Sequence, residues 1–214
     1  MAAATEQDWG KLVHVLQFLK RTKAATLTLK AEGLLQLKWY WDASFATHPD
    51  FKSHTGGALT LGKGVAIAHS KKQKINTNSL TYAEMVAVYD GMNPMLWLSL
   101  FLKAQGIKVD DNILYQDNKS AILLQKNGKA SSTKRTRHMN IKYFYVTDQV
   151  KQGHLKIEYC PTDQMIADYF TKPTTGSTFA KLWELVMNTP FPTESESNAK
   201  MVSFSQCEDT GDSS

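Results

Sequence analysis

The chain has 214 residues, of which 42% are hydrophobic and 21% are charged, so it can bury one sizeable core, and one domain with extensions is expected. Its longest apolar run, Met95 to Leu102, is much shorter than the roughly 20 residues of a membrane-spanning helix, and its N-terminus lacks the order of a secretion signal. We therefore expect no membrane association. Because only Cys160 and Cys207 are present, we expect reduced thiols and an intracellular setting.

Charge is distributed unevenly along the chain. From Asn188 onward five acidic residues stand against Lys200 alone, whereas the preceding part holds 24 basic and 15 acidic residues. The interval between Asp117 and Asp148 has no acidic residue, and its basic residues are Lys119, Lys126, Lys129, Lys134, Arg135, Arg137 and Lys142. This cluster is either a solvated helix face or a site for a polyanion such as nucleic acid, and its one-sidedness favours nucleic acid.

The first segments lead to a central strand. Residues Gln7–Thr22 place apolar side chains at helical spacing and predict an amphipathic helix, and Ala24–Lys30 fits a short strand. Leu34–Phe45 begins with alternating apolar and polar side chains and is rich in aromatics, which predicts a core strand. Asp42 lies in this strand. It is either a turn residue at the strand end or a buried carboxylate that needs hydrogen bonds, a cation or a metal.

A loop and a hairpin follow the central strand. His48–Gly57 contains Pro, His, Ser and two Gly, a composition typical of a loop. Ala58–Leu61 and Val65–His69 predict two strands that turn at Gly62–Gly64. Three consecutive strands therefore open the core.

The longest predicted helix is Leu80–Gln105. Ser79 or Thr81 can cap its start, and Pro94 is expected to bend or divide it. Glu84 lies in the first turns, where a capping or helix-dipole role is the ordinary explanation for an acidic residue.

The next predicted strand, Asn112–Gln116, is followed directly by an acidic residue. Asp117 begins the predicted helix that runs to Gln125. An N-cap role would explain this residue, but the carboxyl ends of parallel strands are also where open sheets place their chemistry.

The remaining elements are a helix, a strand, two more helices and a tail. They are expected at Lys134–Gln152, His154–Tyr159, Thr162–Thr171, Phe179–Met187 and, as a disordered acidic and Ser-rich tail, from Asn188 to the end. Asp168 falls one and a half turns into the helix at Thr162–Thr171. Each of the four carboxylates at 42, 84, 117 and 168 has an ordinary structural explanation, but four such explanations at these places are improbable together.

Six motifs in this order resemble the ribonuclease H domain of copia-type long-terminal-repeat retrotransposon polyproteins. They are Trp41-Asp42-Ala43-Ser44-Phe45, His69-Ser70-Lys71-Lys72-Gln73, Ser79-Leu80-Thr81-Tyr82-Ala83-Glu84, Gln116-Asp117-Asn118-Lys119-Ser120-Ala121-Ile122, Thr136-Arg137-His138-Met139-Asn140-Ile141-Lys142-Tyr143 and the run from Tyr159 to Pro173. Single motifs of this kind are weak evidence, whereas the ordered series is specific.

The resemblance implies an α/β ribonuclease H-like fold, with a mixed five-stranded sheet of three antiparallel strands and then two parallel ones, flanked by helices. It also implies the domain limits. Residues 1–33 would be a connecting segment from an upstream reverse transcriptase, 34–175 the ribonuclease H domain, 176–187 a C-terminal helix and 188–214 the tail.

The resemblance further implies catalysis by two Mg²⁺ ions, with Mn²⁺ able to replace them. Asp42 would bridge both ions, Glu84 and Asp117 would hold the ion nearer the leaving group, and Asp168 the ion that activates water. Oxygen ligands suit this hard cation, and two such ions can promote in-line hydrolysis of a phosphodiester that leaves a 5′ phosphate and a 3′ hydroxyl. Without metal, the clustered carboxylates should repel, so that some have raised pKa values.

Substrate contacts are also implied by the resemblance. Asn78, Ser79, Tyr82 and Asn118 would contact the backbone and ribose hydroxyls of a hybrid, while Lys134, Arg135 and Arg137 would bind phosphates. Many ribonucleases H carry a His in the loop before the last Asp, but Cys160-Pro161-Thr162-Asp163 contains none. His138 either substitutes for it or has a structural or phosphate-contacting role.

The sequence therefore predicts an endonuclease that degrades the RNA strand of RNA/DNA hybrids during reverse transcription, in the cytoplasm within virus-like particles and next to or fused with a reverse transcriptase. Two alternatives remain open. One is a non-catalytic hybrid-binding or connection module of the same fold. The other is an integrase-type nuclease, for which the acid on the first long helix, Glu84, would be dispensable.

Overall fold

A five-stranded mixed sheet forms the centre of the computed structural model, which describes residues 4–31, 33, 35–128 and 144–192. The strands lie in the order β5-β3-β2-β6-β7, with bounds Ile67–Lys72, His54–Thr60, Gln36–Ser44, Asp111–Gln116 and Lys156–Tyr159. The first three pair antiparallel, and β2 with β6 and β6 with β7 pair parallel. The predicted fold class is confirmed.

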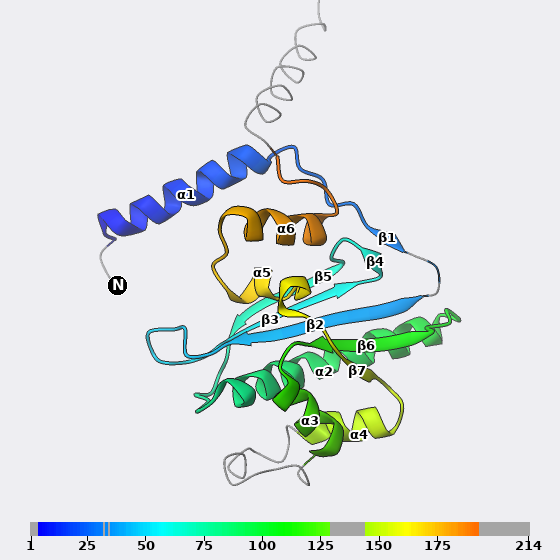
Figure 1. The fold of residues 1–214 in the computed structure, drawn as a ribbon. Helices are drawn as coiled ribbons and strands as arrows, with labels where there is room; N and C mark the ends of the chain where they lie inside the picture. The colour runs from blue at the N-terminus through cyan, green and yellow to red at the C-terminus, as the bar shows by residue number, and fades with distance from the viewer. Residues whose placement is uncertain (1–3, 32, 34, 129–143, 193–214) are drawn as a thin grey trace, which may run out of the picture.

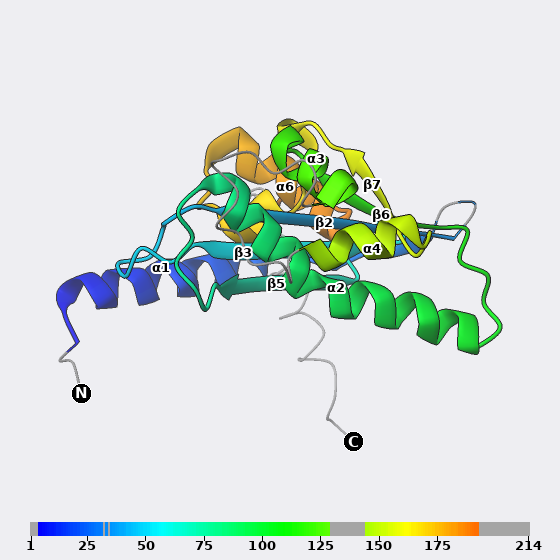
Figure 2. The same cartoon turned by 90° about the horizontal axis from the view of Figure 1, so that it is seen from below.

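Helices cover both faces of this sheet (Figure 1). On one face lie α2 (Leu80–Ala104), α3 (Lys119–Asn127) and α4 (Tyr145–Lys151), and on the other α5 (Asp168–Thr171) and α6 (Gly176–Met187), with the 3₁₀ turn η3 at Thr162–Gln164. Figure 2 shows the same molecule from below, with α2 running the length of the sheet. The layers bury the main core between β2 and α2.

Trp41 determines how closely α2 can approach the sheet. Its indole is 2% exposed and lies between Gly57 of β3 and Gly91 of α2. A Cβ at Gly57 would lie 2.5 Å from the Trp41 ring, and one at Gly91 would meet it still more closely. Only glycine leaves room for the ring at these two positions, so the β2–β3 pair and α2 share one packing unit.

The predicted loop at His48–Gly57 is partly wrong, because β3 begins at His54 and includes both glycines. Gly56 lies opposite Asp42 and Gly57 opposite Trp41 in the antiparallel register. Their composition is typical of a turn, but their role is to admit side chains from the neighbouring layers. The preceding loop ends at Ser53.

Three other predicted elements differ from the structure. The strand expected at Ala24–Lys30 is reduced to β1 (Lys30–Ala31), which pairs with β4 (Gly62–Lys63). The helix expected at Thr162–Thr171 is η3 followed by a turn and α5, so Asp168 begins a helix and does not lie one and a half turns into one. Helix α2 continues through Pro94, so the expected division there is wrong, while the alternative of a bend stays a prediction.

The N-terminal helix and the chain after α6 lie together. Helix α1 (Glu6–Thr22) places Phe18 against Phe179 and Trp183, with ring centroids 6.3 and 5.9 Å apart. Beyond α6, Phe191 packs edge-on against Trp183, and the Thr189 hydroxyl donates to the carbonyl of Thr26 at 3.3 Å. The ordered chain therefore extends past Asn188, where disorder was expected, at least to Pro192. Residues 193–214 of the predicted tail lie outside the described residues.

Helix α2 is the one described helix with the length and hydropathy of a membrane span. Its first half supplies core residues, among them Met85, Val88, Met92 and Met95, which are at most 1% exposed. Its second half carries exposed apolar side chains, including Trp97 at 60% and Leu100 at 66%.

Candidate active site

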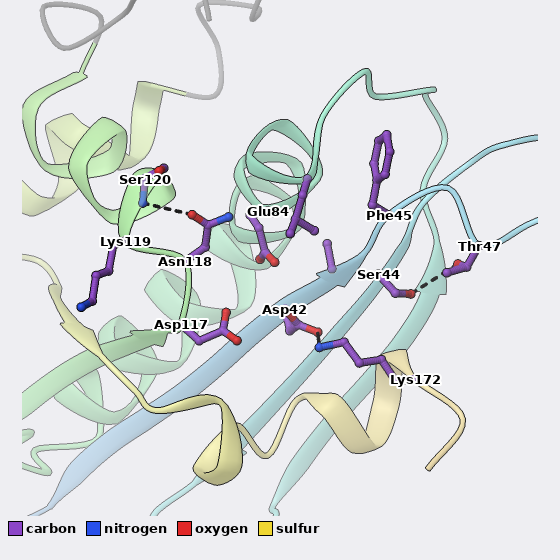
Figure 3. Close-up of a pocket in the computed structure, with 12 residues that line it drawn as sticks. Asp42, Ser44, Phe45, Thr47, Glu84, Asp117, Asn118, Lys119, Ser120 and Lys172 are labelled. Carbon is purple, nitrogen blue, oxygen red and sulfur yellow. Dashed lines mark hydrogen bonds and ion pairs between the residues drawn. The ribbon is translucent and has the colours of Figure 1, made fainter. Parts of the chain in front are cut away.

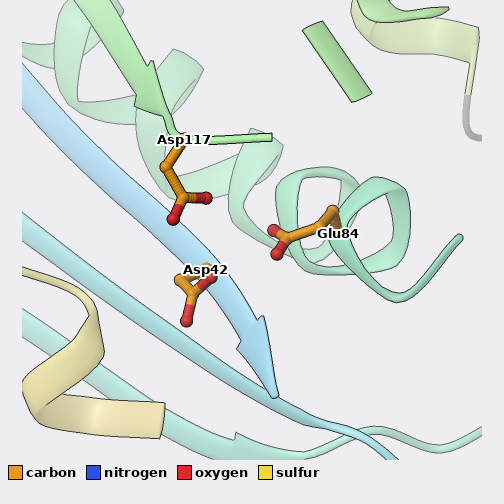
Figure 4. Close-up of side chains that lie close together, drawn as sticks. All are labelled: Asp42, Glu84 and Asp117. Carbon is orange, nitrogen blue, oxygen red and sulfur yellow. The ribbon is translucent and has the colours of Figure 1, made fainter. Parts of the chain in front are cut away.

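Three carboxylates from separate elements converge above the sheet (Figure 4). Asp42 projects from β2, Glu84 from the second turn of α2, and Asp117 from the residue after β6. One carboxylate oxygen from each lies within 4.8 Å of the others, and within the described part of the chain this is the one acidic, His or Cys group so arranged. The parallel pairing of β2 with β6 brings Asp117 beside Asp42.

Asp42 is almost fully enclosed, with an exposure of 1%. Its Oδ2 accepts a hydrogen bond from the Thr171 hydroxyl at 2.7 Å and lies 3.3 Å from the Lys172 ammonium. Burial favours the protonated carboxyl, but the charge of Lys172 and the Thr171 hydrogen bond outweigh it and hold the pKa of Asp42 below its ordinary value. Asp42 is thus a buried carboxylate and not a strand-end turn residue.

Glu84 is buried to a similar degree, at 2% exposure, but among the described residues it has no ion-pair partner. Burial, together with the negative charge of Asp42, raises the pKa of Glu84 well above its ordinary value. The Gln116 side-chain amide donates to Glu84 Oε2 at 3.2 Å and orients the carboxylate. The helix is capped by Ser79, whose hydroxyl accepts from the backbone N–H of Tyr82 at 3.2 Å, so Glu84 is not needed for capping.

Asp117 is likewise not needed as a helix cap. The N-cap of α3 is Asn118, whose Oδ1 accepts from the N–H groups of Ser120 and Ala121 at 3.0 and 3.1 Å. Asp117 Oδ2 instead accepts a hydrogen bond from the Thr162 hydroxyl at 3.1 Å. Burial and the charge of Asp42 raise the pKa of Asp117.

Asp168 approaches the group from the opposite layer, on α5. Its Oδ1 lies 2.7 Å from Lys172 Nζ, and the same ammonium reaches Asp42. Burial raises the pKa of Asp168 to about 6; the hydrogen bond from Lys172 opposes this shift and the charge of Asp42 adds to it. Asp42 and Asp168 therefore approach each other across the two layers, with the Lys172 ammonium in contact with both.

The donor set fits a hard divalent cation. Asp42, Glu84 and Asp117 offer only carboxylate oxygens, which Mg²⁺ and Mn²⁺ accept, and no Cys or His from the described part of the chain belongs to the group. Burial and the charge of Asp42 raise the pKa values of Glu84 and Asp117 in the absence of metal, and a divalent cation bound between them would favour their ionised forms. The geometry therefore supports a metal centre at these three residues.

The predicted substrate-binding residues are only partly brought to this centre. Asn118 lines the same pocket as Asp42 and Glu84 (Figure 3). Asn78, Ser79 and Tyr82 lie at the start of α2, beside the pocket residue Leu80 but not among those that line it. The Ser79 hydroxyl is engaged as a helix cap, and Tyr82 packs against the cluster of Met85 and Leu124.

Four further predicted residues lie outside the described residues, namely Lys134, Arg135, Arg137 and His138. Their roles in phosphate binding and proton transfer stay predictions. The described helical part of the predicted helix at Lys134–Gln152 is α4, where Val146 is fully buried.

Sequence reasoning missed the residues that orient the carboxylates: Gln116, Thr162, Thr171 and Lys172. All four stand inside the motifs that carry the resemblance, so their presence was visible, but their hydrogen bonds join elements distant in sequence. The one local signal was the spacing of four residues between Asp168 and Lys172, which allows an ion pair on a helix.

The chain was compared with known proteins. No protein-family model matches it. Among solved structures, a ribonuclease H1 isolated from compost by a metagenomic approach is 17% identical with a TM-score of 0.46, covering 64% of this chain and 94% of that one. Ribonuclease H1 from Halobacterium salinarum is 16% identical with a TM-score of 0.42, and the coverage is 64% and 94%.

Curated relatives are retrotransposon polyproteins. The Pol polyprotein of transposon TNT 1-94 from Nicotiana tabacum is 31% identical over 182 residues, that of transposon RE1 from Arabidopsis thaliana is 32% identical over 181 residues, and the Gag-Pol polyprotein of transposon Ty1-JR2 from Saccharomyces cerevisiae is 30% identical over 141 residues. These matches cover 85%, 84% and 66% of this chain but only 14%, 12% and 8% of the polyproteins. The chain belongs to the family of long-terminal-repeat retrotransposon Pol polyproteins and corresponds to a segment of them with a ribonuclease H fold.

Proposed function

We propose that the chain is a metal-dependent endonuclease that hydrolyses the RNA strand of RNA/DNA hybrids during reverse transcription. The observation that carries the proposal is the convergence of Asp42, Glu84 and Asp117 within 4.8 Å on this fold. The relation to Pol polyproteins supports the substrate class, because reverse transcription produces an RNA/DNA hybrid as its first product.

Asp42, Glu84 and Asp117 would hold one divalent ion, and Asp42 with Asp168 a second. Bound Mg²⁺ supplies an activated water and neutralises the charge on the leaving oxygen. The chain itself fixes the direction of the ligands, and Lys172 with Thr171 favours the ionised form of Asp42. Thr171 holds Asp42, Gln116 holds Glu84 and Thr162 holds Asp117, each through one hydrogen bond between 2.7 and 3.2 Å.

Selection of RNA over DNA would depend on polar groups that reach the ribose 2′ hydroxyl. Asn118 is the predicted residue best placed for this role, because it lines the pocket that contains the carboxylates. Its Oδ1 is used to cap α3, so the side chain would present its amide N–H groups to the substrate. The amide would then donate to the hydroxyl oxygen.

The test is cleavage of four labelled duplexes or strands in Mg²⁺: the hybrid, double-stranded RNA, double-stranded DNA and single-stranded RNA. We expect cleavage of the RNA strand of the hybrid alone, with 5′ phosphate and 3′ hydroxyl ends. Binding of the hybrid without cleavage by a folded, metal-loaded chain would refute the nuclease and support the binding-module alternative. Cleavage of double-stranded DNA that survives Glu84→Gln would instead support the integrase-type alternative.

A further inference from the structure

Lys172 lies between two of the proposed metal ligands. It directly follows α5, and its Nζ is 2.7 Å from Asp168 Oδ1 and 3.3 Å from Asp42 Oδ2. Figure 3 shows its side chain extending from α5 to Asp42 on the sheet. The backbone N–H of Lys172 also donates to the carbonyl of Asp168 at 3.0 Å, which fixes the base of the side chain relative to that residue.

Lys172 balances the negative charge of Asp42 at only one of its two carboxylate oxygens. The Thr171 hydroxyl and the Lys172 ammonium both contact Oδ2. Figure 4 shows the Asp42 carboxylate near those of Glu84 and Asp117. The Asp42 side chain is 2% exposed, so water cannot stabilise its charge. The Lys172 ammonium stabilises it instead. The two sides of the bridging carboxylate are therefore unequal before any metal binds.

A divalent ion between Asp42 and Asp168 would lie close to the two oxygens that Lys172 now contacts. Mg²⁺ lies 2.0–2.1 Å from its oxygen ligands, and an ammonium beside the same ligands would repel it strongly. The Lys172 side chain is 39% exposed, so it has a path into solvent. Binding of that ion is thus coupled to departure of the lysine.

We propose that Lys172 is a resident cation that holds the Asp42–Asp168 side of the site until a divalent ion displaces it. The ion held by Asp42, Glu84 and Asp117 then binds first and the ion at Asp168 binds second. This inference rests on the proposed function for the identity of the ligands. Lys172 acts in it as a positioning residue, which keeps two carboxylates from different layers together in the metal-free protein.

The test is a titration of the full chain with Mn²⁺, in which electron paramagnetic resonance measures the free ion. The wild type is expected to bind one ion at least tenfold more tightly than the second. Lys172→Met should tighten the second ion at least tenfold and change the first less than threefold, while Lys172→Arg should retain the order of the wild type. Lys119→Met is the matched control. Lys119 lines the same pocket, but its ammonium lies over the Tyr159 ring at 5.0 Å.

Failure of this inference can be distinguished from failure of the proposed function. Two ions of equal affinity in the wild type would overturn the inference without any variant, as would a second ion that is unchanged or weaker in Lys172→Met. Either result combined with hybrid cleavage leaves the nuclease intact. A wild-type chain that binds no Mn²⁺ would overturn both. An equal gain in Lys119→Met would mean that general charge, and not the position of Lys172, sets the order.

Discussion

Gly56 lies directly opposite Asp42 in the antiparallel pairing of β3 with β2, and α5 packs onto this glycine. A Cβ at position 56 would lie 2.8 Å from the carbonyl oxygen of Ala167 and still closer to the Thr171 side chain. The bare backbone at Gly56 therefore lets α5 approach near enough for Thr171 and Lys172 to reach Asp42.

Gly56→Ala is expected to separate α5 from the sheet. The added methyl group overpacks a closed contact, for which a loss of about 1–3 kcal/mol in the free energy of unfolding is typical, and hybrid cleavage should fall because Asp168 moves with α5. Chemical denaturation and the cleavage assay measure the two effects. Gly10→Ala is the control: a Cβ there meets nothing within 4 Å, and alanine favours the surrounding helix. Equal behaviour of the two variants would contradict the argument.

The hydrogen bond from Thr171 to Asp42 should matter even without metal. Thr171→Val keeps the shape of the side chain but removes the hydroxyl that donates at 2.7 Å to a buried charge. We expect a loss of about 1.5–3 kcal/mol in the free energy of unfolding in EDTA, measured by urea denaturation. Thr171→Ser retains the donor and should recover most of this loss. A valine variant as stable as the wild type in EDTA would contradict this role of the hydroxyl.

The strongly patterned elements could be predicted from sequence, because their own side chains determine them. The alternation around Trp39 and Trp41 and the long apolar face of α2 gave the two layers that carry Asp42 and Glu84. Gly56 and Gly57 were misassigned because their composition indicates a turn, whereas their real constraint is the bulk of Trp41 and α5 across the interface. No local pattern contains that information.

The acidic residues of the candidate site could be predicted from the sequence, but the hydrogen bonds and the ion pair that orient them could not. Four carboxylates at four topological places indicated a centre, and three of them converge as expected, with Asp168 joined through Lys172. Thr162 and Asp117 are 45 residues apart in sequence, so their hydrogen bond follows only from the folded chain. The break between η3 and α5 was missed because Thr162–Thr171 lacks a Gly or Pro that would mark it.

Asp117→Asn should abolish most of the hybrid cleavage. Asparagine preserves the size of the side chain and one oxygen but removes the negative charge that the ion requires, and a loss of about 3 kcal/mol in transition-state stabilisation corresponds to roughly 100-fold in rate. Asp163→Asn is the matched control, because this carboxylate is 68% exposed and paired with Lys181 at 3.1 Å. Single-turnover cleavage rates with saturating Mg²⁺ compare the variants. Full activity in Asp117→Asn would exclude it from the metal centre.

Metal affinity should depend on pH in the range set by Asp168. Its pKa of about 6 means that protons compete with a cation for this carboxylate, so affinity for the ion at Asp168 should fall as pH drops through 6 and level off above about 7. Calorimetric titrations with Mn²⁺ between pH 5 and 8 measure this. Asp168→Asn should remove the pH dependence of binding of the ion at Asp168. The pH dependence of binding of the ion held by Asp42, Glu84 and Asp117 should remain. A wild-type affinity that is constant across this range would contradict the assignment.

Glu84→Gln is expected to inactivate the chain and yet stabilise it without metal. A carboxyl whose folded pKa is raised stabilises the fold fully below its unfolded value, here 4.5, and loses that contribution as pH rises through the folded pKa. In EDTA, the variant should therefore melt at a higher temperature than the wild type at pH 7–8, and the difference should shrink toward pH 4.5. Mg²⁺ should raise the melting temperature of the wild type more than that of the variant, because only the wild type retains all three ligands. A variant that is less stable than the wild type in EDTA at pH 8 would mean that Glu84 contributes packing or hydrogen bonds that outweigh the cost of its buried charge.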